Sequence, residues 1–342
     1  MTKLKIPLLA LALITPLGFA CYAQAGTTPV TADNFVRAES HKFFSRVVER
    51  GGFGKFVHNR DLVPVDVQVV VRPNRDTLYS SAVFDLDAGP ITVTLPEAGQ
   101  RYFSMSVVNE EQYAQDLIYA PGPHRFTRES VGTRYVLLGV RTLVDPAVAS
   151  DLLQARELQD RIQVQQENGP GRFDIPQWDQ ASQKQVRDSL LALAATLPDS
   201  RGMFGLRGEV DPVRHLIGSA SAWGGNPESD TVYETVTPAS NDGTTAYRLV
   251  VKDVPVDAFW SISVYNAAGY FERNALNAYT LNNLAAKREE DGSIAVQFGG
   301  CDGQVTNCLP ITAGWNYMVR LYKPRAEILS GDWRFPEASL AP

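Results

Sequence analysis

Short apolar segments separated by turn residues constrain this chain more than any other feature of its sequence. Residues 80–86, 91–95 and 101–108 are rich in Val, Ile, Tyr and Phe, and the intervening residues 87–90 and 96–99 contain Gly and Pro. β-Branched and aromatic residues favour strands, whereas Gly, Pro and Asp favour turns. Short strands at this spacing are typical of an antiparallel β sandwich or barrel.

A helical middle separates this region from a second β-rich half. Residues 145–165 and 180–197 have the caps and apolar spacing of two helices, and residues 65–71 have the Val-rich pattern of a further strand. We therefore predict a mainly β protein with helical segments. The predicted domains are an N-terminal β sandwich (26–145), a helical linker (146–205) and a C-terminal β sandwich (206–342).

The first 25 residues have the composition of a secretory signal peptide. Lys3 and Lys5 form a positive n-region, residues 6–19 form an apolar h-region, and Ala23-Gln24-Ala25 matches the cleavage pattern. We predict cleavage after Ala25 and a periplasmic or secreted protein. The alternative is a lipoprotein with a lipidated Cys21, whose preceding residues loosely resemble a lipoprotein box.

The two remaining cysteines fit an exported protein. Cys301 and Cys308 have six residues between them, including the turn signal Asp302-Gly303. In an oxidising compartment this pair should form a disulfide that closes a small loop. A redox or metal pair is the weaker alternative, because the spacing is not C-x-x-C and no histidine lies nearby.

Composition and missing motifs exclude several functions. The formal net charge is -6 with dispersed cations, which argues against nucleic acid or an anionic membrane surface as partner, and no run after residue 25 could cross a bilayer. The chain has only four histidines and no esterase elbow, zinc-protease helix, phosphate loop or dinucleotide motif. We expect no metal and no cofactor, while homo-oligomerisation stays open.

The stretch from Val71 to Tyr79 concentrates polar side chains between two apolar runs. One interpretation is an Arg–Asp bridge that fixes the chain to a neighbouring loop. The other is an arginine fork for an anionic or hydroxyl-rich group, with Asp76 and Tyr79 as catalytic residues. The residues predicted to bind substrate in this stretch are Arg72, Asn74 and Arg75.

Aromatic residues next to amide side chains are a second group that could line a ligand-binding site. Trp223 is followed by Gly224-Gly225-Asn226, and Trp260 lies five residues before Tyr265-Asn266. Such pairs stack on sugar rings and bond hydroxyl groups, but they also pack in sandwich cores. Core packing is favoured for Trp260, whereas Trp223 and Asn266 are predicted to bind substrate.

Two motifs resemble a known bacterial family pair. V-x-P-N-R-D-T-L-Y, D-L-x-x-G-P and R-Y-x-S-x-x-V-x-N, within residues 71–109, resemble domain of unknown function 1254. Residues 255–265 with the later Arg320-Leu321-Tyr322 resemble its usual companion, domain of unknown function 1214. The resemblance implies two jelly-roll-like sandwiches in an exported protein, and its first motif ends at Asn109, which we add to the predicted substrate-binding residues.

These observations lead to two hypotheses. The first is an exported hydrolase or lyase that acts on a polar small molecule or glycan where the 71–79 motif meets the second domain. The alternative is a non-catalytic envelope protein that binds a glycan or partner, in which the same arginines form a structural lock. A large pocket beside Asp76 favours the enzyme, whereas a buried network without one favours the lock.

Overall fold

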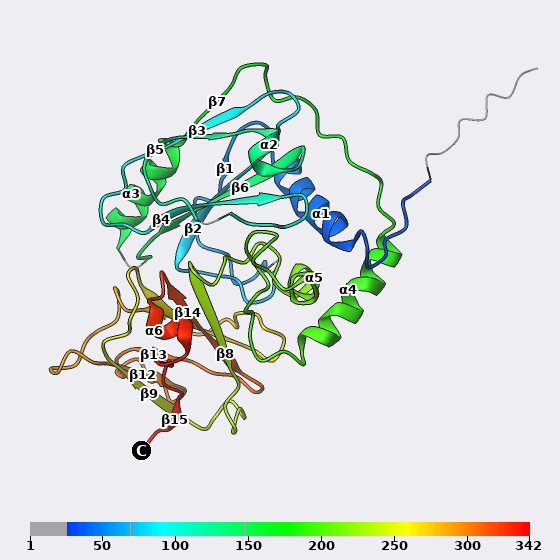
Figure 1. The fold of residues 1–342 in the computed structure, drawn as a ribbon. Coiled ribbons are helices and arrows are strands. Elements are labelled where there is room, and N and C mark those ends of the chain that lie inside the picture. The colour runs from blue at the N-terminus through cyan, green and yellow to red at the C-terminus, as the bar shows by residue number, and fades with distance from the viewer. Residues whose placement is uncertain (1–25, 69, 116, 147) are drawn as a thin grey trace, which may run out of the picture.

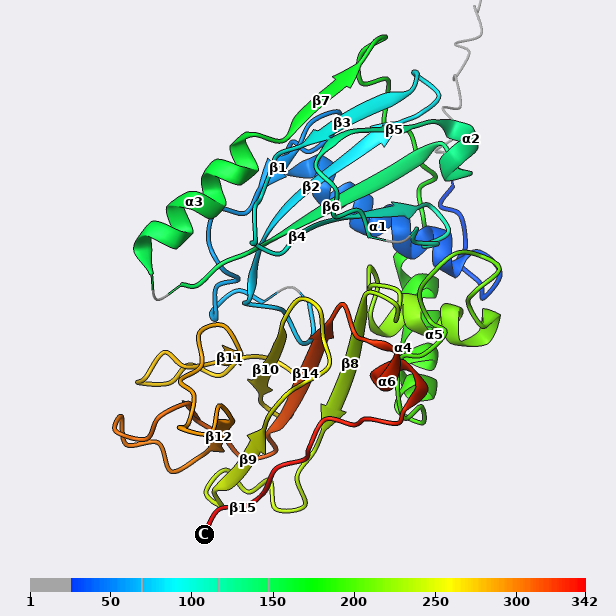
Figure 2. The same cartoon turned by 60° about the vertical axis from the view of Figure 1, so that its left-hand side comes forward.

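The computed structural model describes residues 26–342 except residues 69, 116 and 147. Two β-rich parts, one from each half of the chain, lie against each other, with α1, α4 and α5 beside both (Figures 1 and 2). The predicted mainly β fold with helical segments is confirmed. The helices are α1 (Phe35–Glu49), α2 (Arg128–Val131), α3 (Ala149–Asp160), α4 (Gln180–Ala194), α5 (Pro212–Ser221) and α6 (Ala326–Ser330).

The first part consists of two antiparallel sheets that share one apolar core. Alternating side chains explain the packing: Ile91, Val93 and Leu95 are buried in this core while the threonines between them face outward. One sheet has the order β1 (Val57–His58), β2 (Thr77–Asp85), β6 (Tyr135–Leu143), β4 (Phe103–Asn109). The other has the order β5 (Gly122–Phe126), β3 (Ile91–Leu95), β7 (Gln163–Gln166).

The second part has the same construction. Trp260, Ile262 and Val264 of β10 enter its core, so Ser261, Ser263 and Tyr265 lie on the opposite face of the sheet. One sheet has the order β11 (Thr280–Asn282), β10 (Trp260–Tyr265), β14 (Asn316–Tyr322), β8 (Thr231–Val236). The other has the order β13 (Cys308–Leu309), β12 (Ile294–Phe298), β9 (Tyr247–Val251), β15 (Ser339–Leu340), in which only β12 and β13 run parallel.

The helices form a third cluster beside the two β parts. Phe35 and Ala38 of α1 pack with Leu190 of α4 and Ile217 of α5. The helix α5 begins where the Asp211 side chain accepts hydrogen bonds from two main-chain N–H groups of the first turn. Within the described residues, no helix has both the length and the apolar character that a bilayer span needs.

Two sequence predictions about this architecture need correction. The described residues of 65–71 form turns and irregular chain instead of a strand, because the Gln68 side chain bonds the main chain of Val65 and Phe271. The helix predicted through 165 ends at Asp160, and β7 follows it and pairs with β3. The predicted linker thus contributes a strand and Leu158 to the first part, while the proposed division into domains stays a prediction.

Candidate functional site

The 71–79 motif lies where the two β parts meet, and most of it is a loop that ends in β2. Arg72 has a φ of 50°, the left-handed conformation that non-glycine residues rarely adopt. Its N–H donates to the carbonyl of Gly269 at 2.8 Å. Gly269 permits this approach because a Cβ atom there would lie 2.7 Å from Val71 Cγ1. The loop therefore packs closely on the turn that follows β10.

Arg320 of β14 holds this loop from the second part. Its Nη2 donates to the carbonyl of Arg72 at 2.9 Å and to the hydroxyl of Tyr265 at 2.7 Å, and its Nη1 donates to Ser263 Oγ at 2.9 Å. Tyr265 in turn donates to the carbonyl of Pro73 at 2.7 Å. Arg320 is only 3% exposed, so these bonds are made away from water, where they are strong.

Asn74 and Asp76 complete the network. Asn74 donates from Nδ2 to the Tyr322 hydroxyl at 2.8 Å and accepts from the Asp76 N–H at 2.7 Å. Asp76 is 1% exposed, and its Oδ1 accepts from Thr280 Oγ1 at 3.2 Å. Burial raises the pKa of Asp76, and the positive charge of Arg320 and nearby polar side chains only partly oppose this rise. The carboxyl group is thus enclosed by protein.

Arg72 and Arg75 do not form a fork. Arg72 Nη2 donates to Asn316 Oδ1 at 3.3 Å, and burial lowers the pKa of Arg72. Arg75 donates to the carbonyl of Val63, and its guanidinium carbon lies 5.1 Å from the ring centre of Tyr279. Neither arginine forms an ion pair with Asp76 among the described residues, so the simple Arg–Asp bridge is also absent there. The lock uses Arg320 and main-chain carbonyls instead.

Tyr79 belongs to a neighbouring and more open part of the junction. It is half-buried on β2, directly opposite Arg141 of β6. The guanidinium carbon of Arg141 lies 5.6 Å from the centre of the Tyr79 ring. A cation at this distance from an aromatic ring is attracted by the ring electrons. Tyr79 and Arg141 therefore form one unit on the face of the sheet.

The loop between α5 and β8 holds Arg141 in place. Its Nη1 donates to Asn226 Oδ1 at 2.6 Å and its Nη2 approaches the carbonyl of Gly224 at 3.5 Å, while Asn226 itself bonds Thr231. Among the described residues, no carboxylate lies within ion-pair distance of Arg141. The hydrogen bonds of the guanidinium thus go to neutral amide and carbonyl oxygens.

The charge of Arg141 is maintained by tyrosines. Burial lowers the pKa of Arg141, but the electrostatic influence of surrounding phenol groups outweighs burial and raises the pKa above its ordinary value. These groups are Tyr79, Tyr102, Tyr233 and Tyr322. The side chain is therefore a permanent cation in a wall of hydroxyl groups, which is a suitable surface for an anionic or hydroxyl-rich molecule.

The structure does not bring Asn109 to this junction. Asn109 pairs with Val136, whereas Thr77 pairs with Leu143 at the other end of the sheet, roughly 20 Å away at the usual rise per residue. Its Oδ1 accepts from the N–H groups of Glu111 and Tyr113 at 3.0 and 3.1 Å. Asn109 therefore stabilises the turn after β4.

The side chain of Trp223 packs on helix α1. Its Nε1 donates to Ser40 Oγ at 3.1 Å, and its ring stacks on Phe43 with the ring centres 4.4 Å apart. The following residues of the same loop, Gly224 and Asn226, contact Arg141. Trp223 thus positions the loop that holds Arg141.

Asn266 lies near Arg72, but its side chain serves the turn after β10. Its Oδ1 accepts from the N–H groups of Ala268 and Tyr270, both at 3.0 Å, and its Nδ2 donates to Glu272 at 2.9 Å. Its carbonyl accepts from Asn316, which also accepts from Arg72. Asn266 thus lies beside the motif with its amide group already bonded, and its predicted role in binding stays a prediction.

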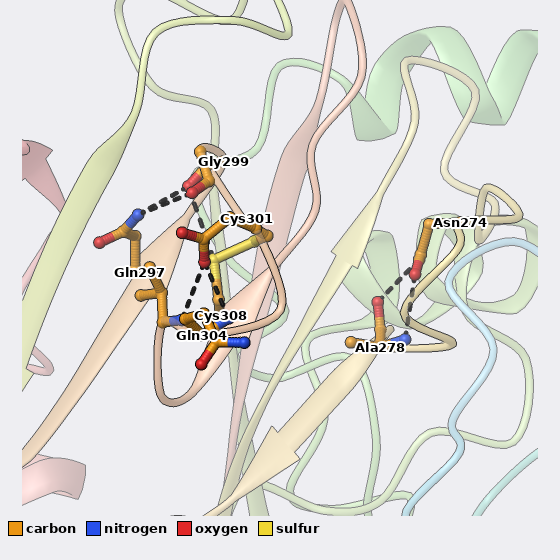
Figure 3. The surroundings of a disulfide bond; sticks show 10 residues. Asn274, Ala278, Gln297, Gly299, Cys301, Gln304 and Cys308 are labelled. Carbon is orange, nitrogen blue, oxygen red and sulfur yellow. Dashed lines mark hydrogen bonds between the residues drawn. A yellow bond between two sulfur atoms is a disulfide. The ribbon is translucent and has the colours of Figure 1, made fainter.

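The predicted disulfide between Cys301 and Cys308 is confirmed. The two Cα atoms are 5.7 Å apart, and the bond closes a loop at one end of the second part (Figure 3). Gln297 Nε2 donates to the carbonyl of Gly299 at 3.0 Å just before this loop. Among the described residues, no hydrogen bond or ion pair joins residues 299–308 to residues 71–79.

Two cavities are each lined by residues of one β part. One of about 180 Å³ is lined by residues of the second part that include Lys252, Trp260 and Arg288. The other, of about 340 Å³, is lined by residues between Glu97 and Arg161 in the first part. Across the described residues, no group of three or more His, Cys, Asp or Glu side chains is arranged to hold a metal ion.

The residues predicted to form the site did not include Arg141 or Arg320, although Arg320 belongs to the second family motif. Arg141 and Arg320 each stand alone in an otherwise strand-like, mostly apolar run. A single cation inside such a run has to find partners when the strand is buried. This signal could have identified both side chains, although it would not have identified their partners.

Comparisons with known proteins support the predicted family resemblance. Residues 53–125 match the family model described as protein of unknown function DUF1254, and residues 232–326 match protein of unknown function DUF1214. No curated protein matches the chain. The fold is similar to the crystal structure of the VPA0106 protein from Vibrio parahaemolyticus, with a TM-score of 0.70 and 18% identity over 91% of this chain and 98% of that one.

A second solved structure has a more distant similarity. It is a putative uncharacterized protein from Burkholderia cenocepacia, with a TM-score of 0.50 and 13% identity over 90% of this chain and 86% of that one. At these identities the similarity concerns the fold alone.

Proposed function

This chain joins a DUF1254 segment to a DUF1214 segment, and we propose that it binds a small anionic or hydroxyl-rich ligand where they meet. One observation carries the proposal: Arg141 is half-buried at the junction, surrounded by tyrosines, with no carboxylate partner among the described residues. The acceptors of Arg141 are neutral, and a buried cation gains from an anionic partner because burial of an uncompensated charge is costly. A carboxylate or sulfate would supply the missing charge.

In this proposal the 71–79 motif acts as a lock and not as a reaction centre. Asp76 is enclosed by protein, and Arg320 is occupied by Ser263, Tyr265 and the carbonyl of Arg72. Groups that are buried and bonded in this way hold two parts of a chain together. The ligand would contact Arg141, Tyr79 and Tyr233, which lie outside that network.

Binding of glucuronate tests the proposal, because this probe combines one carboxylate with several hydroxyl groups. We expect isothermal titration calorimetry to give saturable binding of glucuronate and much weaker binding of glucose. Arg141→Lys keeps the charge but loses the planar fork, so it should weaken glucuronate binding about tenfold. Arg248→Lys, at an exposed position on β9, is the matched control and should leave the affinity unchanged.

Two results would contradict this assignment. One is equal affinity of wild type and Arg141→Lys for glucuronate. The other is the absence of saturable binding by glucuronate, galacturonate and glucose sulfate at millimolar concentrations. A fall in affinity of Arg248→Lys equal to that of Arg141→Lys would show a general charge effect.

A hydrolase or lyase is the second candidate. The observation in its favour is the half-buried Tyr79 beside Arg141, since a phenol next to a bound ligand can donate a proton. Asp76 would then have no catalytic role and would only help to stabilise the buried network of the 71–79 motif. Screening purified protein against ester, glycan and sulfated substrates, beside Tyr79→Phe, separates catalysis from binding. Turnover that Tyr79→Phe abolishes, at unchanged ligand affinity, would support the enzyme.

The two β parts and the export route are proposals of the same kind. We propose that each pair of sheets is a jelly-roll-like sandwich, because each pair shares one core and its strands are largely antiparallel. We also propose that the protein is exported, which the Cys301–Cys308 disulfide supports. The signal peptide and Cys21 lie outside the described residues, and a native N-terminus at Gly26 would support cleavage after Ala25.

A further inference from the structure

We propose that the ligand of Arg141 is a single hexuronate ring, whose carboxylate binds Arg141 and whose ring lies over Gly139. This inference rests on the function proposed above. It adds the chemical class of the ligand, its size and its position on the sheet. The observation that carries it is a gap in the cover of β2 and β6.

Four neighbouring residues form this gap. Tyr79 and Ser81 are the half-buried residues of β2, Gly139 and Arg141 are those of β6, and every other residue of these two strands is buried. The register pairs Tyr79 with Arg141 and Ser81 with Gly139. Alternate residues of a strand share a face, so all four lie on the face opposite to the core that Ala82 enters. We call these four residues the sheet window.

The sheet window is closed on all sides by protein. Both β2 and β6 are interior strands of their sheet, so the exposure does not come from a sheet edge. At one end lies the apolar cluster that contains Val83, Phe44 and Trp223, and at the other end Leu143 packs with Phe259. The uncovered part spans two residue pairs, roughly 7 Å along the strands and about 5 Å between them. One six-membered ring fits this area.

Gly139 forms the floor of the sheet window. Glycine weakens the interior of a strand and often marks a place where a ligand approaches the main chain. The φ of Gly139 lies outside the left-handed region, so its conformation does not require glycine. A Cβ atom there would have two neighbours within 4 Å among the described residues, Ser106 Oγ at 2.9 Å and Leu137 Cδ2 at 3.8 Å, both from the same sheet. The space over Gly139 is therefore open.

The chemistry of the sheet window narrows the ligand class. The hydroxyls of Tyr79 and Ser81 have no hydrogen bond with the described residues, and Arg141 bonds neutral oxygens. One guanidinium matches one carboxylate, and free hydroxyls match the hydroxyls of a sugar. A hydrocarbon ring would gain little there, because the window contains no aliphatic side chain. A hexuronate combines one carboxylate with several hydroxyls on one ring.

Gly139→Ala tests the position of the ring by isothermal titration calorimetry. The added methyl group would occupy the place of the sugar ring, so glucuronate should bind at least tenfold more weakly than to wild type. Two further titrations of wild type test the class and the size. Cyclohexanecarboxylate, with the same ring size and no hydroxyls, should bind at least tenfold more weakly than glucuronate. Digalacturonate should bind at most a few fold more tightly than galacturonate.

Matched variants separate the open space from a packing defect. Gly139→Ala also crowds Ser106, so the double variant with Ser106→Ala removes that contact and keeps the methyl group in the window. Ser106→Ala alone should bind glucuronate like wild type, and the double variant should bind it like Gly139→Ala. Gly208→Ala adds a methyl group at an exposed position with no atom within 4 Å among the described residues, and should change nothing.

Ser81→Ala gives the test if the Gly139 variants unfold. The Ser81 hydroxyl has no hydrogen bond with the described residues, so its removal should leave the fold intact. Loss of one hydrogen bond between neutral groups should weaken glucuronate binding by a few fold.

Failure of this inference differs from failure of the proposed function. Suppose that Arg141→Lys weakens glucuronate binding, while Ser81→Ala and the double variant bind it like wild type. An anion then binds Arg141, but its ring does not lie over Gly139. Equal affinity for cyclohexanecarboxylate and glucuronate would overturn the sugar class, and a hundredfold preference for digalacturonate over galacturonate would overturn the single ring. No binding of any of these probes to wild type would overturn both proposals.

Discussion

At the scale of single residues, Asp76 combines strong burial with few partners. Its Oδ1 accepts a hydrogen bond from Thr280, whereas Oδ2 has no hydrogen-bond partner among the described residues. Burial raises its pKa from the ordinary 3.8. The folded protein therefore binds this proton more tightly than the unfolded chain does.

Asp76→Asn should change the pH dependence of stability. The free energy of unfolding of wild type, measured relative to the variant, should fall as the pH rises from about 3.8 through the raised pKa of Asp76. The loss should be about 1.4 kcal/mol for each unit by which the folded pKa exceeds its ordinary value. Urea unfolding at a series of pH values measures this difference.

Asp242→Asn is the matched control for Asp76→Asn. Hydrogen bonds from the N–H and hydroxyl of Thr245 and from the N–H of Thr244 lower the pKa of Asp242. Wild type should therefore gain stability relative to this variant as the pH rises, which is the opposite sign. If wild type also gained stability relative to Asp76→Asn as the pH rises, Arg320 would stabilise the Asp76 carboxylate more than burial destabilises it.

At the scale of elements, the segments with alternating apolar residues are those that the sequence predicted well. Residues 91–95 form β3, because a strand with one buried face requires this alternation. The prediction of a strand over the Val-rich residues 65–71 was wrong. Val67, Val70 and Val71 are exposed, and the Gln68 side chain holds the chain in turns. Local propensity favours a strand there, but the described residues of the segment pair with no strand.

The disulfide loop gives a prediction at this scale. Replacing both Cys301 and Cys308 by Ala should lower the free energy of unfolding by about 2 kcal/mol, because the unfolded chain regains the freedom of a short loop. Chemical denaturation of the variant and of wild type measures this loss. A reducing agent should destabilise wild type to the same extent and leave the variant unchanged. Free thiols in unreduced peptic fragments would contradict the bond.

At the scale of the whole molecule, the two β parts are joined through a buried polar network and through an apolar cluster, in which Tyr102 and Leu143 of the first part pack with Phe259 and Tyr322 of the second. Arg320 of β14 bonds the carbonyl of Arg72, and Tyr265 of β10 bonds the carbonyl of Pro73. Such bonds need defined geometry, so they fix the orientation of one part on the other. The junction surface around Arg141 depends on that orientation.

Arg320→Met should uncouple the two parts. The change removes bonds to four neighbouring groups and leaves Asp76 without its cation, so we expect a loss of about 3–5 kcal/mol in the free energy of unfolding. Calorimetry should then show two transitions, or a van't Hoff enthalpy below the calorimetric one. Arg325→Met removes an exposed cation paired with Asp257 and should leave the unfolding almost unchanged. An unaltered single transition in Arg320→Met would contradict the lock.

The sequence by itself determined the properties that depend on neighbours in the chain. The mainly β fold, the Cys301–Cys308 pair and the importance of residues 71–79 all follow from local patterns of side chains. Only the tertiary structure decided what those residues do. Arg72 and Arg320 are separated by 248 residues, and no local pattern specifies which buried cation faces which carbonyl. The same reason explains why Arg141, a single charge inside a strand, became the centre of the proposed site.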